Sequence, residues 1–355
     1  MIKILFLPNW KITYCNSVPE DKQPPDYYLK GAPYWFFRYF EDRPIVDVID
    51  ISSFRLLERF EKNKLRFYIW QALRAIPRLS KYDVIVSHGM QSGIVISLFR
   101  RFFPTKAKHL VFDIGAFNSA AESGLALKLM QFASKSIDGV IYHTSSQGEY
   151  YKRYFPHIVN KSKFIKFGTD SEFFACQYEQ EVSGKPYCIC VGYNKRDWNT
   201  LVQAYRRIDS NKLDLMLVGH VDNSLDDIPG IIQIESVPIK ELIRLIAGSK
   251  FGVLPLKSFN YSFGQMTLMQ QMALGKCVIA SKVPSLEDYV VDGETAVLFE
   301  SENSYDLYEK IEMVNNDDNY RNSVEKKAKE YIVNCCNEKT MAKDIELFIR
   351  ERDAW

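Results

Sequence analysis

No uninterrupted apolar run in this sequence approaches the roughly 20 residues of a membrane-spanning helix. The first residues also lack the features of a secretory signal peptide, because Met1–Leu7 has no basic start and runs directly into Pro8. These absences argue against a membrane-spanning or secreted protein. We therefore expect a cytoplasmic location, either free or peripheral on the inner face of a membrane.

Cysteine is scarce as well, with seven residues in a chain of 355. Their number is odd, and no two of them have the C-x-x-C spacing of many zinc and redox sites. The pattern therefore predicts neither a disulfide framework nor a zinc site. We expect reduced thiols, most of them in the core, at Cys15, Cys176, Cys188, Cys190, Cys277, Cys335 and Cys336.

Length and composition indicate a globular protein of two domains. A chain of 355 residues is too long for one ordinary hydrophobic core, and 46% of its residues are hydrophobic against 25% charged. Short apolar runs alternate with longer segments of helical periodicity, which predicts parallel sheets built from βαβ units. This order indicates an α/β fold with two Rossmann-like doubly wound domains facing each other across a cleft.

The apolar runs also give the expected boundaries. In the first half, strands are expected at 2–7, 84–87, 110–112 and 139–142, with helices at 55–79, 91–103, 119–136 and 146–155. In the second half, strands are expected at 187–191, 213–218, 231–234, 251–254, 277–280 and 296–299, with helices at 197–208, 238–248, 265–274, 304–315 and 321–351. We place an N-terminal domain at 1–168, a C-terminal domain at 185–320, and a helical segment at 321–355 that crosses back to the N-terminal domain.

Charge is distributed unevenly along the chain. Residues 1–166 contain 25 Lys and Arg against 14 Asp and Glu, whereas the rest contains 21 against 30. In the basic half, cations alternate with large apolar side chains at 59–70 and 98–108. Such segments are either helices with one core face and one solvated face, or docking sites for an anionic membrane surface. No recognisable nucleic-acid-binding module accompanies them, so nucleic acid is not expected as a partner.

Gly264 introduces the most informative segment of the chain, a loop, an apolar helix and a buried strand in immediate succession. A glycine at the start of a helix lets backbone N–H groups and the positive helix end approach an anion. Gly275 ends the predicted helix before the strand at 277–280. This layout suits a diphosphate.

A second glycine turn follows the strand at 187–191. After Gly192, Asp197 can cap the next helix, and Lys195 or Arg196 can meet a phosphate at the helix N-terminus. Taken alone, the segment could be a solvated turn. Because it and the Gly264 loop follow strands of one predicted sheet, the pair predicts a diphosphate clamp.

Taken in order, several motifs resemble those of retaining glycosyltransferases of the GT-B fold, specifically their large family 4. Phe167–Asp170 with Phe174 is similar to the family's hinge before the second domain, and Gly192 with Arg196 to its glycine turn and the following basic residue. The similarity spans residues 165–300, and the N-terminal half matches mainly in strand spacing.

The resemblance implies transfer of a sugar from a nucleoside diphosphate sugar with retention at the anomeric carbon. The departing diphosphate gains charge, so cations and backbone N–H groups aimed at it stabilise the transition state. The resemblance implies no metal, and no cofactor besides the donor substrate. It assigns donor binding to Gly192, Lys195, Arg196, Gly264, Gln265, Met266, Thr267, Gln270 and Glu287.

The sequence departs from the family pattern around the donor loop. The family usually has two glutamates eight positions apart, and Ser262 and Gln270 stand at these positions here. Gln270 can still accept a hydrogen bond from a ribose hydroxyl, but it carries no charge, so we expect weaker binding. Tyr193 stands where an arginine often follows the glycine. Glu287 could equally be a carboxylate that stabilises the first turn of a helix.

On the acceptor side, two polar residues end predicted strands. His88 and Asp113 are candidate catalytic residues beside Arg196, because either could orient an acceptor hydroxyl or steady the sugar. Each could instead form hydrogen bonds only to the turn that follows its strand. His143 ends another strand, where the neighbouring Thr144 offers a simple capping partner.

These features favour a retaining glycosyltransferase that uses a glycan or lipid-linked glycan acceptor in the synthesis of a surface polysaccharide or glycoconjugate. Two alternatives stay open. A sugar-nucleotide epimerase of the same fold would consume donor without an acceptor. A non-catalytic partner of another transferase would bind donor without turning it over.

Overall fold

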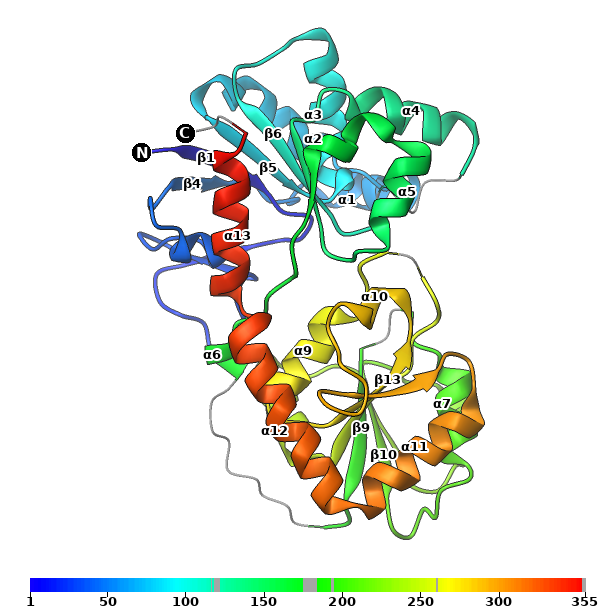
Figure 1. The fold of residues 1–355 in the computed structure, drawn as a ribbon. Coiled ribbons are helices and arrows are strands. Elements are labelled where there is room, and N and C mark those ends of the chain that lie inside the picture. The colour runs from blue at the N-terminus through cyan, green and yellow to red at the C-terminus, as the bar shows by residue number, and fades with distance from the viewer. Residues whose placement is uncertain (116, 118–121, 175–183, 193–194, 260, 353–355) are drawn as a thin grey trace.

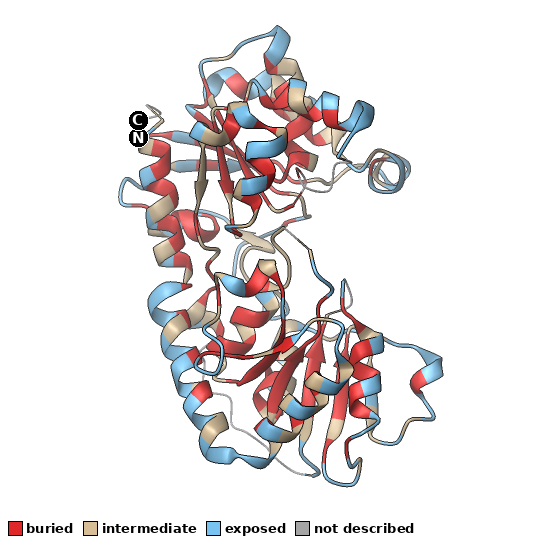
Figure 2. Cartoon of the chain, turned by 45° about the vertical axis from the view of Figure 1, so that its right-hand side comes forward, coloured by how far each residue is buried: buried red, intermediate tan, exposed pale blue. Residues whose placement is uncertain are grey.

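The computed structural model describes residues 1–115, 117, 122–174, 184–192, 195–259 and 261–352. These residues form two domains, each built on one parallel sheet of six strands, with the N-terminal domain at the top of Figure 1. Figure 2 shows that the central strands of both sheets are buried and that the helices expose their outer faces. The predicted α/β class with two doubly wound domains is confirmed.

The N-terminal sheet has the strand order β4-β1-β5-β6-β7-β8, so strand addition changes direction between β1 and β5. Its strands are β1 (Lys3–Leu7), β4 (Ile45–Val48), β5 (Val84–His88), β6 (Lys108–Asp113), β7 (Gly139–Tyr142) and β8 (Ser162–Phe164). A small parallel pair, β2 (Thr13–Cys15) and β3 (Tyr27–Leu29), lies in the connection from β1 to β4.

The C-terminal sheet has the order β11-β10-β9-β12-β13-β14, with the change of direction between β9 and β12. Its strands are β9 (Tyr187–Val191), β10 (Asp214–Val218), β11 (Ile231–Ile234), β12 (Phe251–Leu254), β13 (Val278–Lys282) and β14 (Val297–Glu300). In open parallel sheets, ligands bind at the carboxyl ends of the strands where the order changes direction.

Helices cover both sheets, and among the described residues none is long and apolar enough to cross a membrane. Those of the N-terminal half are α1 (Arg55–Phe60), α2 (Ile69–Ala75), α3 (Met90–Phe102), α4 (Gly124–Ser134), α5 (Gln147–Tyr154) and α6 (Ser171–Phe174). Those of the C-terminal half are α7 (Trp198–Tyr205), α8 (Ile239–Gly248), α9 (Gln265–Ala273), α10 (Pro284–Glu287), α11 (Ser304–Asn316), α12 (Asp318–Cys335) and α13 (Glu338–Arg350). Shorter helical turns are η1 (Trp35–Tyr39), η2 (Glu61–Leu65), η3 (Ile76–Lys81), η4 (Pro156–Lys161) and η5 (Asn223–Leu225).

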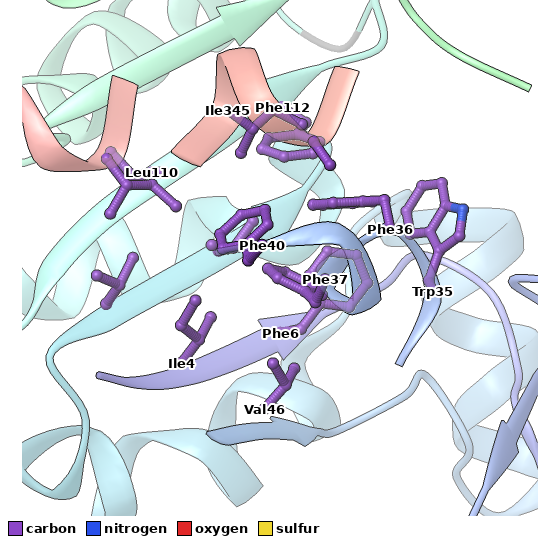
Figure 3. Packing of buried hydrophobic residues seen from close by; sticks show 14 of the residues in the cluster. Ile4, Phe6, Trp35, Phe36, Phe37, Phe40, Val46, Leu110, Phe112 and Ile345 are labelled. Atoms are coloured by element: carbon purple, nitrogen blue, oxygen red, sulfur yellow. The ribbon is translucent and has the colours of Figure 1, made fainter. Parts of the chain in front are cut away.

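The chain crosses between the domains twice. The first crossing follows β8, and the second lies between α12, which packs on α9, and α13, which packs on η1. Ile345 of α13 joins Phe36 and Phe112 in the aromatic core of the N-terminal domain, as Figure 3 shows. The crossings touch, because the Thr169 N–H donates to the Cys336 carbonyl at 3.0 Å.

Two long predicted helices are divided in the structure. The expected helix at 55–79 becomes α1, η2, α2 and η3, because Arg66 takes a left-handed backbone (φ 60°) that ends the helix after η2. The expected helix at 321–351 ends at Cys335 and resumes at Glu338, where the chain passes between the domains. The sequence reading also missed β4 and β8, which are short strands at the two edges of the sheet.

Candidate active site

The first part of the site lies where the C-terminal sheet changes direction. The loops after β9 and β12 are joined there, because the Asp197 N–H donates to the Pro255 carbonyl at 3.0 Å. The Asp197 carboxylate in turn accepts from the Thr200 N–H at 3.2 Å, which confirms the predicted cap of α7. Gly192, Arg196 and Asp197 therefore lie at the position where doubly wound domains bind ligands.

Arg196 is buried at this position. Its Nε and Nη2 donate to the Val191 carbonyl at 2.9 and 2.7 Å, and Nη2 also donates to Oγ1 of Thr267 at 3.1 Å. A Cβ atom on Gly192 would lie 2.6 Å from Nη2, so only glycine leaves room for the guanidinium. Burial lowers the pKa of Arg196, with nearby Cys190 acting in the opposite direction. The hydrogen bond to Thr267 joins Arg196 to the first turn of α9.

Gly264 begins α9 with a left-handed backbone (φ 84°). A Cβ atom there would lie 2.5 Å from Cδ1 of Leu256, so the position requires glycine for both its backbone and its packing. The first N–H groups of a helix have no partner within the helix. The structure thus brings Arg196, Thr267 and the N-terminus of α9 to one place, with the Arg196 guanidinium 5.9 Å from the centre of the Phe263 ring.

Lys195 lies beside this cluster but, unlike Arg196, is not buried. It is exposed, has a left-handed backbone (φ 59°), and places its ammonium 4.3 Å from the centre of the Phe259 ring. Tyr193, which stands where the family often has an arginine, lies outside the described residues.

The other predicted residues of α9 face the N-terminal domain. Gln265 is buried, and its Nε2 donates to Oγ1 of Thr144 at 3.0 Å and to the Ser285 carbonyl at 2.7 Å. Met266 and Gln270 line a narrow crevice with the segment Gln23–Pro25. The amide nitrogen of Gln270 donates to Oε1 of Gln23 at 3.2 Å.

Glu287 is exposed at the end of α10, and its neighbour Asp288 makes the contact across the domains. One carboxylate oxygen of Asp288 accepts from the Ser145 N–H at 2.7 Å. Next to it, the hydroxyl of Tyr289 donates to the His143 carbonyl at 2.6 Å and accepts from the Phe167 N–H at 2.9 Å. The sequence reading missed both residues.

The carboxyl edges of the two sheets therefore meet in an interdomain seam, formed by Thr144 and Ser145 after β7 and by Gln265, Asp288 and Tyr289 from the C-terminal domain. Gly115, just after β6, also lies against Tyr261 in the loop before α9, because a Cβ atom on Gly115 would lie 2.6 Å from Cδ2 of Tyr261. The seam places the loops of the N-terminal domain next to α9.

His88 lies at the end of β5, where the N-terminal sheet changes direction, but it is sealed from solvent. Its ring centre lies 4.8 Å from that of Trp10 and 5.8 Å from those of Trp35 and Phe112. Neither ring nitrogen has a hydrogen-bond partner among the residues that the structure describes. Burial, and to a smaller degree His143, lowers the pKa of His88 to about 3, so the imidazole is neutral near pH 7.

Asp113 is buried at the end of β6, where it organises its own domain. Its carboxylate accepts from the N–H groups of Gly115 and Phe117 at 2.8 and 3.3 Å, from Nε2 of Gln147 at 3.0 Å and from the Tyr151 hydroxyl at 2.5 Å. Burial raises its pKa, while these donors lower it. His143 is also buried, with Nδ1 2.7 Å from the Ile165 carbonyl and its pKa lowered to about 4 by burial.

Metal ligands do not gather in the described part of the chain. None of its groups of three or more His, Cys, Asp or Glu could hold a metal ion. Six cysteines fall in that part, and all six are free thiols.

Solved structures resemble this chain over nearly its whole length. It aligns with sucrose-phosphate synthase from Thermosynechococcus elongatus at a TM-score of 0.73 and 16% identity, covering 99% of each chain. It aligns with Anabaena HepE in complex with UDP-glucose at a TM-score of 0.71 and 13% identity, covering 99% of this chain and 100% of that one. The fold is GT-B.

Two comparisons of sequence add to this likeness of fold. Residues 185–317 match the family described as glycosyl transferases group 1. An uncharacterized glycosyltransferase from Methanocaldococcus jannaschii is 26% identical in an alignment of 237 residues, which covers 59% of this chain and 65% of that relative. The match thus spans less than two thirds of the relative's length. The residues that match this family include Gly192, Arg196 and Gly264.

Proposed function

We propose that this protein is a retaining glycosyltransferase of family 4 that transfers a sugar from a nucleoside diphosphate sugar to a glycan or lipid-linked glycan. The glycosyl transferases group 1 domain and the relative from Methanocaldococcus jannaschii support a glycosyltransferase. A neighbour of the same fold, HepE, binds UDP-glucose, which supports a nucleotide-sugar donor. The observation that carries the proposal is the meeting of Arg196 with the N-terminus of α9.

In this proposal the diphosphate lies between Arg196 and the first turn of α9. As the bond to the sugar lengthens, negative charge grows on the diphosphate, and a fixed cation and fixed N–H donors stabilise it. The Val191 carbonyl and Thr267 hold the guanidinium before the donor arrives, so little reorganisation is needed. Lys195, exposed at the rim, supplies a second cation. This chemistry requires no metal ion.

The remaining donor contacts follow from the same placement. Gln270 accepts from a ribose hydroxyl through its amide oxygen, while its nitrogen stays on Gln23. Gln265 and Met266 contribute backbone groups, since the Gln265 side chain is engaged in the interdomain seam. Glu287, exposed at the end of α10, reaches the donor from the opposite side.

On the acceptor side, the proposal assigns positioning rather than proton transfer to the candidate residues. His88 is neutral and enclosed, and the carboxylate of Asp113 is bound by four donors of its own domain. Neither arrangement supplies the acid and base that an epimerase needs, which favours transfer to a separate acceptor.

The experiment is a thermal-shift panel of nucleoside diphosphates and their sugars, because a ligand that binds only the folded state raises the unfolding temperature. Nucleotides of one base should raise the unfolding temperature. Release of the nucleoside diphosphate from the matching sugar donor should then require a glycan acceptor. Release of a rearranged donor without an acceptor would show an epimerase. Binding without turnover over a broad acceptor panel would show a non-catalytic partner, and no shift with any nucleotide would contradict the proposal.

A further inference from the structure

Helix α4 has an apolar stripe that faces away from the core. Leu125, Leu129 and Phe132 are 85%, 43% and 39% exposed, and their spacing places them on one side of the helix. The opposite side already supplies the core, where Leu127 and Met130 are buried. The exposed stripe therefore has no partner among the described residues of this chain that would account for it.

The end of α3 extends this stripe. Phe102 and Phe103 are 69% and 62% exposed, and the Phe102 ring centre lies 6.1 Å from that of Phe132. Helices α3 and α4 pack against each other along one side of the N-terminal domain, as Figure 1 shows. The five exposed apolar side chains thus form one surface rather than scattered positions.

Cations surround these apolar side chains. The Arg101 guanidinium lies 5.0 Å from the centre of the Phe132 ring, and Lys128 is exposed between Leu125 and Leu129. Lys135 is exposed one turn further on. Neither helix contains an Asp or Glu. We call the surface formed by Arg101, Phe102, Phe103, Leu125, Lys128, Leu129 and Phe132 the α3–α4 patch.

Apolar side chains interleaved with cations match the interface of an anionic bilayer, where rings and leucines enter the acyl boundary and cations meet headgroups. Each Lys or Arg near such a surface strengthens binding roughly fivefold. An apolar protein partner would not need the cations, and a nucleic acid would not need the exposed leucines. The second half of the chain is acidic, so an anionic surface would repel it and attract the basic N-terminal domain.

We propose that the α3–α4 patch is the docking surface for an anionic lipid bilayer. The inference extends the proposed function, because docking through the N-terminal domain would bring a lipid-linked acceptor to the interdomain seam. It rests on the exposed residues of α3 and α4 alone, and vesicle binding is measured without donor or acceptor. Failure of docking and failure of sugar transfer are therefore separate results.

The test is cosedimentation of the full chain with vesicles of phosphatidylglycerol and phosphatidylcholine, and with vesicles of phosphatidylcholine alone. The wild type should bind the anionic vesicles, and binding should weaken as salt screens the charges. Leu125→Ser with Phe132→Ser should lower the partition coefficient by roughly tenfold or more. Lys128→Glu should lower it several-fold.

The matched controls lie on the C-terminal domain. Val333→Ser and Lys326→Glu change an exposed apolar residue and an exposed lysine of α12, and both should bind like the wild type. All substituted residues are exposed, so the unfolding temperatures should stay close to that of the wild type. Absence of binding to anionic vesicles, equal binding to neutral vesicles, or an equal loss in the controls would overturn the proposal.

Discussion

The carboxyl edges of the two sheets use their polar residues in different ways. At the C-terminal sheet, Arg196 and Thr267 come from separate loops and meet beside the open end of α9. At the N-terminal sheet, aromatic rings enclose His88, and four donors of the same domain hold Asp113. In the proposed function, the first edge is therefore prepared for the donor, while the facing edge is a packed scaffold that positions its loops.

Arg196→Ala should give the largest effect, because it removes the central cation of the C-terminal edge. We expect turnover to fall by roughly 100-fold to 1000-fold, the usual cost of one group that stabilises developing charge. Arg206→Ala, an exposed arginine just after α7, should leave the rate unchanged. The measurement is donor consumption with saturating acceptor, and an unchanged rate in Arg196→Ala would remove this residue from the site.

A comparison of Gly264→Ala with Gly124→Ala tests the two domains directly, because Gly264 before α9 and Gly124 of α4 have similar left-handed backbones (φ 84° and 88°). Both alanine variants should lose about 1–3 kcal/mol of stability from the left-handed backbone. Only Gly264→Ala also crowds Leu256, whereas a Cβ atom at Gly124 meets nothing within 4 Å. Nucleotide affinity by titration calorimetry should therefore fall at least tenfold in Gly264→Ala alone. Equal affinities would show that the α9 N-terminus does not contact the nucleotide.

His88→Phe tests whether the N-terminal edge is packed as described. Burial lowers the pKa of His88 from its ordinary 6.5 to about 3, so the unfolded chain takes up a proton below pH 6.5 that the folded protein does not. The wild type therefore loses stability as the pH falls from 6.5. When the pH falls from 6.5 to 5, the free energy of unfolding should decrease by about 2 kcal/mol less in His88→Phe than in the wild type. Unfolding curves at a series of pH values measure this, and identical slopes would show that His88 is not sealed.

Gln270→Glu should give the smallest effect. A carboxylate accepts more strongly than an amide from ribose hydroxyls, so we expect nucleotide binding to tighten by several-fold, up to roughly tenfold. The Gln23 amide can turn to donate to the new carboxylate. Titration with the nucleotide found in the thermal-shift panel measures the change. Unchanged or weaker binding would place the ribose away from Gln270.

Much of this arrangement could be predicted from local sequence. Each apolar run of the second half became one strand of the sheet, and the glycines at 192 and 264 marked both turns that meet at the site. The seam could not be predicted in this way. Gln265 and Thr144 are 121 positions apart, and Asp288 and Ser145 are 143 apart, so their contacts depend on how the domains close. For the same reason, sequence favoured Glu287 over the neighbouring Asp288.

The account depends most on where the diphosphate binds. A crystal structure with a bound nucleoside diphosphate sugar tests this directly. We predict phosphate oxygens within hydrogen-bond distance of the Arg196 guanidinium and of the backbone N–H groups at the start of α9. A diphosphate held elsewhere on the molecule, with no phosphate oxygen near the Arg196 guanidinium, would contradict the account.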